Sequence, residues 1–261
     1  MGETAMQESS IMQWEPQGFQ LETTSIWSFP ERGSWATHNG KWRGNWSPYI
    51  PRNIILRYSQ PGDLVLDQFA GGGTTLVEAK LLNRNIIGID TSDAALAECA
   101  TKTEFSHNGA NGRVFIKRGD ARNLSLILDE SIDLICTHPP YANIIQYSED
   151  IPEDISHLAL PDFLTEMQQV AKECYRVLQP GKYCAILMGD IRKGGSVIPL
   201  GFKVMNLFEN AGFTLQELII KGQHNCRSTG YWKASNSRQH FLLLAHEHLF
   251  VFKKKVKLNL I

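Results

Sequence analysis

The sequence predicts an α/β fold, a doubly wound and mostly parallel sheet whose last two strands form an antiparallel hairpin at one edge. Two observations support this prediction. Short apolar runs alternate with helix-length amphipathic segments from residue 63 to residue 211, and no helical segment separates the final two apolar runs. Parallel neighbours need a crossover of about a dozen or more residues, usually a helix, whereas strands without a crossover pair antiparallel.

Each predicted strand is a short apolar run bounded by polar or turn residues. In chain order the strands span residues 63–67, 85–90, 113–117, 132–136, 182–188, 213–220 and 241–252. The predicted helices carry apolar or small residues on one face and span residues 74–83, 93–106, 161–178 and 200–211. A turn at Pro180 and Gly181 is expected to open the strand that follows it.

Length and composition favour one domain with a loosely attached N-terminal segment. The chain has 261 residues, of which 43% are hydrophobic, and this is enough for one sizeable core. We expect residues 1–25 to be flexible, because they lack an apolar periodicity, and residues 26–261 to form the domain. No apolar run approaches the ~18 residues of a membrane span, so we expect a cytoplasmic protein without a membrane partner.

The cysteines do not indicate a metal site or a disulfide framework. There are 5 of them, an odd number, and no C-x-x-C pair occurs. Zinc sites and disulfide frameworks use paired or evenly numbered cysteines. We therefore expect no bound metal, and mostly buried, inert thiols.

Charge is spread so that only local contacts with nucleic acid are favoured. The formal net charge of -1 excludes binding by bulk electrostatics. Residues 33–57 and 221–238, however, mix basic and aromatic side chains without a single carboxylate. Such mixtures suit phosphate contact and base stacking, although an ordinary solvated loop is the simpler alternative. The candidate DNA contacts are Arg192, Lys193, Arg227, Lys233 and Arg238.

Three consecutive glycines, Gly71 to Gly73, lie between the first predicted strand and the first predicted helix. They let backbone N–H groups approach a ligand at a helix N-terminus, although a tight turn alone would also use them. Asp90 ends the second strand about 20 residues further on, where a carboxylate can accept both hydroxyls of a ribose. Asp120 follows the third strand and could accept from an adenine amino group. These features predict a nucleotide-type cofactor site.

A rigid turn from His138 to Tyr141 follows the fourth predicted strand, at the edge where open α/β sheets bind ligands. Pro139 and Pro140 lack N–H groups and leave carbonyl acceptors facing outward, while Tyr141 supplies a flat ring on which a base can stack. This turn suits an amino group presented edge-on. Taken by itself, a Pro-Pro-Tyr turn is also a common loop element.

Together these residues resemble one family, the DNA amino-methyltransferases that make N4-methylcytosine or N6-methyladenine. The stretch from Asp67 to Thr75 is similar to the family's cofactor motif, and Pro139 to Tyr141 match the core of its catalytic motif. Residues 46–63 look like the helix that packs over the methionine end of the cofactor, and residues 246–253 look like the last strand. The resemblance covers roughly residues 27–255.

This resemblance implies a Rossmann-like methyltransferase fold with S-adenosylmethionine as the cofactor. The cofactor-binding residues that it implies are Asp67, Phe69, Gly71, Gly73, Thr74, Thr75 and Asp90, with Asp120 on the adenine. The catalytic residues that it implies are His138, Pro139, Pro140 and Tyr141. The implied reaction is site-specific methylation of cytosine N4 or adenine N6 in duplex DNA, after the base has flipped out of the helix, by direct transfer without a metal.

One departure from the family lies in the catalytic motif itself. The family usually has Asp, Asn or Ser before the two prolines, and this chain has His138. A neutral imidazole accepts a hydrogen bond from an amino group, but a protonated imidazole cannot. Activity is therefore expected to fall as the pH drops through the imidazole pKa, near ~6.5 when unperturbed.

A second departure is the lack of a separate target-recognition domain of the usual bulk. Recognition would then come from residues 143–160, 192–199 and 222–239, or from a homodimer or a separate recognition partner. An RNA or protein-glutamine N-methyltransferase of the same fold, and an inactive module that binds cofactor and DNA, remain open alternatives. The biological setting also remains open between a restriction-modification system and a solitary enzyme.

Overall fold

An eight-stranded sheet forms the centre of the described structure. The computed structural model describes residues 12–142, 151–224 and 242–256. Within these residues the strands lie in the order β1-β9-β10-β6-β5-β2-β3-β4. Their bounds are β1 (Ile26–Trp27), β2 (Leu64–Asp67), β3 (Asn85–Asp90), β4 (Val114–Arg118), β5 (Ile132–Thr137), β6 (Leu178–Gly189), β9 (Phe213–Gly222) and β10 (His246–Lys254).

Most neighbouring strands of this sheet run parallel. β2 pairs parallel with both β3 and β5, and the β3–β4 and β5–β6 pairs are parallel as well. β10 runs antiparallel to both β6 and β9, while the short β1 pairs parallel with β9 and lies outside it. The predicted fold class is therefore confirmed, including an antiparallel pair made by the last two strands. The chain order reverses between β2 and β5, and open α/β sheets bind ligands at such a switch point.

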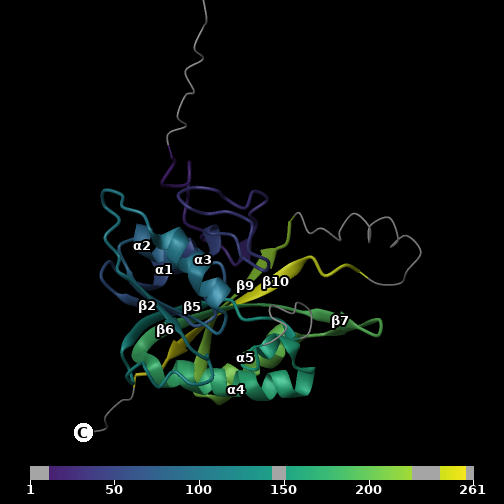
Figure 1. The fold of residues 1–261 in the computed structure, drawn as a ribbon. Helices are drawn as coiled ribbons and strands as arrows, with labels where there is room; N and C mark the ends of the chain where they lie inside the picture. Colours follow the sequence, from purple (N-terminus) through teal and green to yellow (C-terminus); the bar gives the residue numbers. More distant parts are fainter. Residues whose placement is uncertain (1–11, 143–150, 225–241, 257–261) are drawn as a thin grey trace, which may run out of the picture.

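Helices cover both faces of the sheet (Figure 1). One face is covered by α1 (Tyr49–Tyr58), α2 (Thr74–Leu81) and α3 (Asp93–Thr103), and the other by α4 (Leu160–Val177) and α5 (Leu200–Asn210). A short 3-10 helix, η2 (Ile155–His157), precedes α4, and a separate hairpin pairs β7 (Ile191–Lys193) with β8 (Ser196–Ile198). None of the helices in the described ranges is long and apolar enough to cross a membrane.

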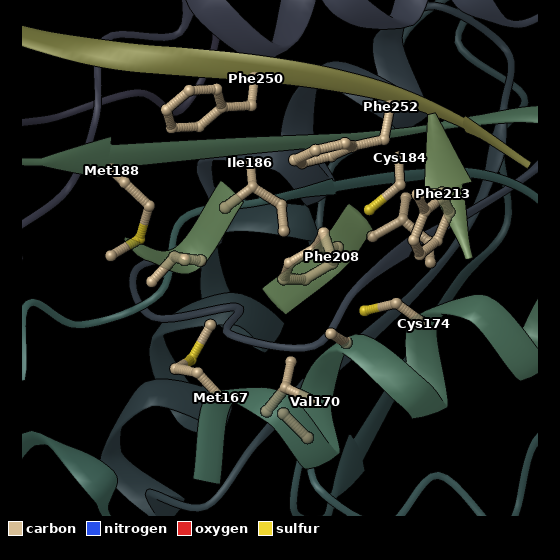
Figure 2. Close-up of a cluster of buried hydrophobic side chains, with 14 of the residues drawn as sticks. Met167, Val170, Cys174, Cys184, Ile186, Met188, Phe208, Phe213, Phe250 and Phe252 are labelled. Carbon is tan, nitrogen blue, oxygen red and sulfur yellow. The ribbon is translucent and has the colours of Figure 1, made fainter. Parts of the chain in front are cut away.

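Alternation along β6 divides its side chains between two buried clusters. Ile186 and Met188 belong to the cluster beneath α4 and α5, whereas Ala185 and Leu187 belong to the cluster beneath α1 and α2. This period of two is what a strand buried on both faces requires. Figure 2 shows the first cluster, in which Phe208 of α5 lies against Phe252 and its neighbours.

The start of β6 differs from the prediction. The strand begins at Leu178, whereas the sequence suggested a new strand at residue 182 after a turn. Leu178 pairs with Ile132, the register then shifts, and Tyr183 pairs with Leu134. Pro180 and Gly181 therefore lie in a bulge within one strand. Proline has no backbone N–H to donate to the neighbouring strand, and a bulge leaves such a residue unpaired.

Residues 12–25 contact the domain, although the sequence suggested a loose segment there. The ring of Trp14 stacks on His107, with centroids 4.6 Å apart, and also contacts Phe105. The carbonyl of Gln13 accepts from the backbone N–H of Ala36 at 2.7 Å. Isolated aromatic anchors attach this segment, and they leave no periodic signal in the sequence.

The buried carboxylate of Glu78 on α2 holds part of the basic aromatic stretch, residues 33–57, inside the fold. Its Oε1 accepts from Trp35 Nε1 at 2.7 Å and lies 2.7 Å from His38 Nε2. Arg52 donates to its Oε2 at 2.9 Å. Glu78 is 0% exposed, and these partners offset the cost of burying a carboxylate. Trp35 and Arg52 are thus committed to the fold and are not available to DNA.

Replacing Phe208 by alanine should cost about 3–5 kcal/mol of unfolding free energy, the range for an aromatic side chain removed from a core. Phe208 is 0% exposed and its ring stacks on Phe252 at 5.2 Å. Phe202→Ala on the same helix is the matched control, because Phe202 is 37% exposed and should cost clearly less. Urea titrations giving equal losses for the two variants would contradict this account of the core.

Candidate active site

A cavity opens at the carboxyl ends of β2, β3 and β5, and residues 42–46 bound one side of it. The space between its walls, counted out into the open mouth, is about 920 Å³. The sequence-predicted residues that line it are Asp67, Phe69, Gly71, Asp90, Asp120, His138 and Pro140. The predicted residues that do not line it are Gly73, Thr74, Thr75, Pro139 and Tyr141.

Asp90 ties the glycine loop to the start of α3. Its Oδ2 accepts from the backbone N–H of Gly71 at 2.8 Å, and its Oδ1 accepts from the backbone N–H of Ser92 at 3.0 Å. Burial raises the pKa of Asp90, while these backbone hydrogen bonds oppose the rise. A carboxylate has about four lone-pair positions, so Asp90 can accept further hydrogen bonds from hydroxyl groups in the cavity.

Asp67 connects the carboxyl end of β2 to that of β5. Its Oδ1 accepts from Thr137 Oγ1 at 2.7 Å and from the backbone N–H of Phe69 at 3.2 Å. The side chain is 2% exposed. Burial raises the pKa of Asp67 to about 6, because a low-dielectric environment disfavours the charged form more than these hydrogen bonds stabilise it.

Close packing explains why the loop after β2 consists of glycines. A Cβ on Gly72 would lie 2.6 Å from the Cβ of Trp42, and a Cβ on Gly73 would lie 3.2 Å from the backbone of α3. Gly73 also has a φ of 74°, a conformation that favours glycine. Thr74 donates from Oγ1 to Asn45 Oδ1 at 2.5 Å. Gly73 and Thr74 therefore fix the loop against its surroundings and do not face the cavity.

Asp120 lines the cavity, but its carboxylate is already paired. Arg122 Nε lies 2.9 Å from both carboxylate oxygens, and Arg122 also donates through its NH2 group at 2.6 Å. A further bond joins Arg122 to Glu166 of α4 at 2.8 Å. The sequence suggested Asp120 as an open acceptor, whereas in the structure an adenine amino group would have to share it with Arg122.

His138 is held from two sides. Its ring stacks on Trp46, with centroids 5.4 Å apart and an interplanar angle of 21°, and its Nε2 lies 2.7 Å from the hydroxyl of Tyr141. Desolvation within the site lowers the pKa of His138 to about 4, an effect that Glu247 opposes and Lys221 reinforces. The imidazole ring is therefore neutral over a wider pH range than an unperturbed pKa near ~6.5 would give.

The candidate DNA contacts fall into two groups. Arg192 on β7 donates to the carbonyl of Gly195 at 2.7 Å and to that of Leu242 at 2.8 Å, so its guanidinium braces the β7–β8 hairpin. Lys193 is exposed at the tip of this hairpin. The other candidates, which lie outside the described residues, are Arg227, Lys233 and Arg238.

Two cavity residues had no signal in the sequence. Asn45 Nδ2 and Gln68 Oε1 are buried and have no hydrogen-bond partner within residues 12–142, 151–224 and 242–256. A buried polar group without a partner costs about 1–3 kcal/mol, so such atoms in a cavity indicate a ligand. One donor and one acceptor of this kind, beside Asp90, fit a ligand with ribose hydroxyls, a carboxylate and an amino group.

The raised pKa of Asp67 has a consequence for stability. The folded state holds this proton up to about pH 6, whereas the unfolded state releases it near 3.8. Stability is therefore lost as the pH rises through this window, by up to about 3 kcal/mol. Asp67→Asn keeps an oxygen acceptor but has no group that titrates. The unfolding free energy of this variant minus that of the parent, measured by urea titration, should therefore increase from about pH 4 to about pH 7. Parallel stability curves for the two proteins would contradict the raised pKa.

Comparison with known proteins agrees with this geometry. The N6/N4 methyltransferase family model, described as DNA methylase, matches residues 3–101 and 132–259, well over half of the chain. A second model, described as the methyltransferase domain of RMKL-like proteins, matches residues 55–182. A solved SAM-dependent methyltransferase from Methanosarcina mazei shares the fold, with a TM-score of 0.54 and 17% identity over 78% of this chain and 98% of that chain.

Two curated relatives match shorter stretches. The Type II beta methyltransferase M.BslI of Bacillus sp. (strain NEB-606) is 30% identical over 158 residues, which are 56% of this chain and 17% of that protein. The tRNA (guanine(10)-N2)-dimethyltransferase of Methanothermobacter thermautotrophicus is 38% identical over 99 residues, which are 38% of this chain and 28% of that protein. The match thus spans less than a third of either relative. On the strength of the family model, the chain belongs to the N6/N4 DNA methylase family of S-adenosylmethionine-dependent methyltransferases.

Proposed function

We propose that the chain transfers a methyl group from S-adenosylmethionine to an exocyclic amino nitrogen of a DNA base, cytosine N4 or adenine N6. One observation carries this proposal. The turn with His138 and Pro140 lines the same cavity as Asp90 and Gly71, so an amino-group acceptor stands next to a site suited to a nucleoside. The family to which the chain belongs is consistent with DNA as the substrate.

The cofactor would be held by both sides of the cavity. Asp90 is suited to the ribose hydroxyls, and the unpartnered Asn45 Nδ2 and Gln68 Oε1 are suited to the carboxylate and amino group of the methionine end. When bound, the cofactor would supply an electrophilic methyl group to the base nitrogen, with the electron pair of the broken S–C bond left on its sulfur and one amino hydrogen of the base lost as a proton. Phe69 lines the same cavity and can cover apolar parts of the cofactor.

His138 would act on the amino group of a base that has flipped out of the duplex. The neutral ring can accept a hydrogen bond from one amino hydrogen, while the carbonyl of Pro139, a residue that does not line the cavity, stays a predicted acceptor for the other. These bonds favour a pyramidal nitrogen with a more available lone pair, and they hold it in line for transfer, where positioning can contribute ~7–11 kcal/mol. The base-stacking role of Tyr141 stays a prediction, since its ring does not line the cavity.

Recognition of a DNA sequence would use surfaces beyond this cavity. Lys193, on the exposed tip of the β7–β8 hairpin, is available to a phosphate, whereas Arg192 is engaged with backbone carbonyls. A homodimer or a separate recognition partner would supply further contacts. A restriction-modification setting is consistent with the Type II relative M.BslI.

RNA is a second candidate substrate, favoured by the match to a tRNA (guanine(10)-N2)-dimethyltransferase. Guanine N2 is also an exocyclic amino nitrogen, so the same acceptors could serve it. Incubation with isotope-labelled S-adenosylmethionine and either unmethylated duplex DNA or unmodified tRNA, followed by nucleoside mass spectrometry, separates the candidates. N4-methyldeoxycytidine or N6-methyldeoxyadenosine supports the proposal. N2-methylguanosine in tRNA alone would replace it, and cofactor binding without any transfer would indicate an inactive binding module.

The role of His138 predicts a definite pH dependence. His138→Asn keeps an acceptor and should retain activity, whereas His138→Leu should lose tens- to hundreds-fold in single-turnover rate, as expected for a lost transition-state hydrogen bond of ~2–4 kcal/mol. Because the pKa of His138 is lowered to about 4, the ratio of parental to Asn-variant rates should be constant above about pH 5 and fall toward pH 4. A ratio that falls near pH 6.5, or a fully active His138→Leu enzyme, would contradict this role.

Asp90→Ala should weaken S-adenosylmethionine binding by ten-fold or more, a loss of ~1–3 kcal/mol, because ribose hydroxyls and the N–H of Gly71 lose their acceptor. The matched control is Asp93→Ala, since the Asp93 side chain is 75% exposed and pairs with Arg118 at the surface. Calorimetry should give parental affinity for this control. Equal affinities of the two variants for S-adenosylmethionine would show that Asp90 does not contact the cofactor.

A further inference from the structure

A chain of hydrogen bonds runs from His138 past β6 to side chains on β10 and β9. His138 Nε2 lies 2.7 Å from the hydroxyl of Tyr141, and that hydroxyl donates to Glu247 Oε1 at 2.9 Å. Lys221 donates to the other oxygen, Glu247 Oε2, at 2.8 Å. Neither Glu247 nor Lys221 lines the cavity. The chain therefore links the candidate catalytic turn to two residues that do not face the cavity.

The sheet is built to allow this link. Glu247 of β10 pairs in register with Gly189 of β6 on one side and with Lys221 of β9 on the other. A Cβ on Gly189 would lie 2.6 Å from Cε2 of Tyr141, so only a glycine at this position lets the tyrosine ring cross β6. The ring thereby brings its hydroxyl to Glu247, which is 7% exposed.

The direction of the hydrogen bonds follows from the charge on Glu247. Burial by itself would raise the pKa of Glu247, but the charge of Lys221 and the hydrogen bonds that Glu247 accepts lower it below the ordinary value. Glu247 is therefore an ionised carboxylate, which only accepts. Tyr141 has one hydroxyl hydrogen, and it is used toward Glu247. The tyrosine oxygen is left as an acceptor toward His138.

This arrangement of hydrogen bonds selects one tautomer of His138. A neutral imidazole carries a single N–H, and the tyrosine oxygen requires it on Nε2. Nδ1 then carries the lone pair. It makes no hydrogen bond within the described ranges, and the ring that carries it lines the cavity.

We propose that Glu247 is a positioning residue: through Tyr141 it holds His138 as the Nε2–H tautomer and so presents the Nδ1 lone pair to the amino group of the target base. This inference rests on the proposed function for the identity of that amino group. It gives the hydroxyl of Tyr141 a role that a base-stacking ring does not need, and it assigns a task to a residue outside both sequence motifs.

The tautomer can be read directly and without substrate. Long-range proton–nitrogen correlation spectra of histidine-labelled protein distinguish protonated from unprotonated ring nitrogens, and the His138→Gln spectrum identifies the His138 signals. The parent should show a protonated Nε2 and an unprotonated Nδ1. Tyr141→Phe and Glu247→Gln should shift both signals toward a mixture of tautomers. A protonated Nδ1 in the parent, or signals unmoved in both variants, would overturn the proposal.

Kinetics test the consequence for transfer. Tyr141→Phe keeps the ring and removes the hydroxyl, so a stacking role predicts the parental rate. The chain of hydrogen bonds from Glu247 through Tyr141 to His138, called the relay below, instead predicts a loss of about 10–100-fold in single-turnover rate. This is the range for partners that orient histidine ligands at metal sites. Affinity for S-adenosylmethionine should not change. Parental activity in Tyr141→Phe would overturn the relay.

Coupling between the two residues is the final check. In the double variant Tyr141→Phe with Glu247→Gln, the loss should be no larger than in the slower single variant, because both changes break the same chain of hydrogen bonds. If the rate loss of the double variant equals the product of the two single losses, the two residues do not act through the same chain of hydrogen bonds. Glu217→Gln is the matched control, since Glu217 is exposed on β9 and the substitution is the same. The nitrogen signals decide the relay even if RNA proves to be the acceptor.

Discussion

Parallel pairing of β2 with both β3 and β5 is the constraint on which the rest of the site depends. Parallel strands end at the same edge of a sheet, so whatever follows them in sequence meets there. The loop with Gly71, the carboxylate of Asp90 and the ring of His138 are contributed by three different strand ends and line one cavity. A slip of one residue in β2 would exchange its two faces and turn Asp67 away from Thr137.

Buried carboxylates connect these strand ends to their surroundings, and their environments differ. The hydrogen bonds from Thr137 and Phe69 reach the same oxygen of Asp67 and neither donor is charged, so burial raises the pKa of Asp67 to about 6. Glu247 has Lys221 beside it, so its pKa lies below the ordinary value despite comparable burial. The first carboxylate can change charge near neutral pH, whereas the second is fixed as an acceptor. That difference suits Glu247 to hold a tautomer.

The antiparallel placement of β10 has a functional as well as a structural consequence. β10 lies between β6 and β9, and its inward residues Phe250 and Phe252 complete the core beneath α5. The same strand carries Glu247 past Gly189, where the Tyr141 ring crosses. One element therefore contributes to the core and contacts the candidate catalytic turn through Tyr141. Under the proposed role of Glu247, a substitution in β10 would affect methyl transfer without contacting either cofactor or substrate.

The sequence by itself determined the fold class, the order of the elements from β2 to β10 apart from η2 and the β7–β8 hairpin, and the strand ends that form the cavity, because these follow from local periodicity and from the rule that crossover strands are parallel. It also predicted Asp90 and the turn at His138 as site residues from motif spacing along the chain, and Asp90, His138 and Pro140 line the cavity. Only the tertiary structure decided which partners these residues have. Glu166 on Arg122, Trp46 on His138 and Glu247 behind Tyr141 come together by register and packing across the fold. Such contacts join residues up to 106 positions apart, and no local pattern encodes them.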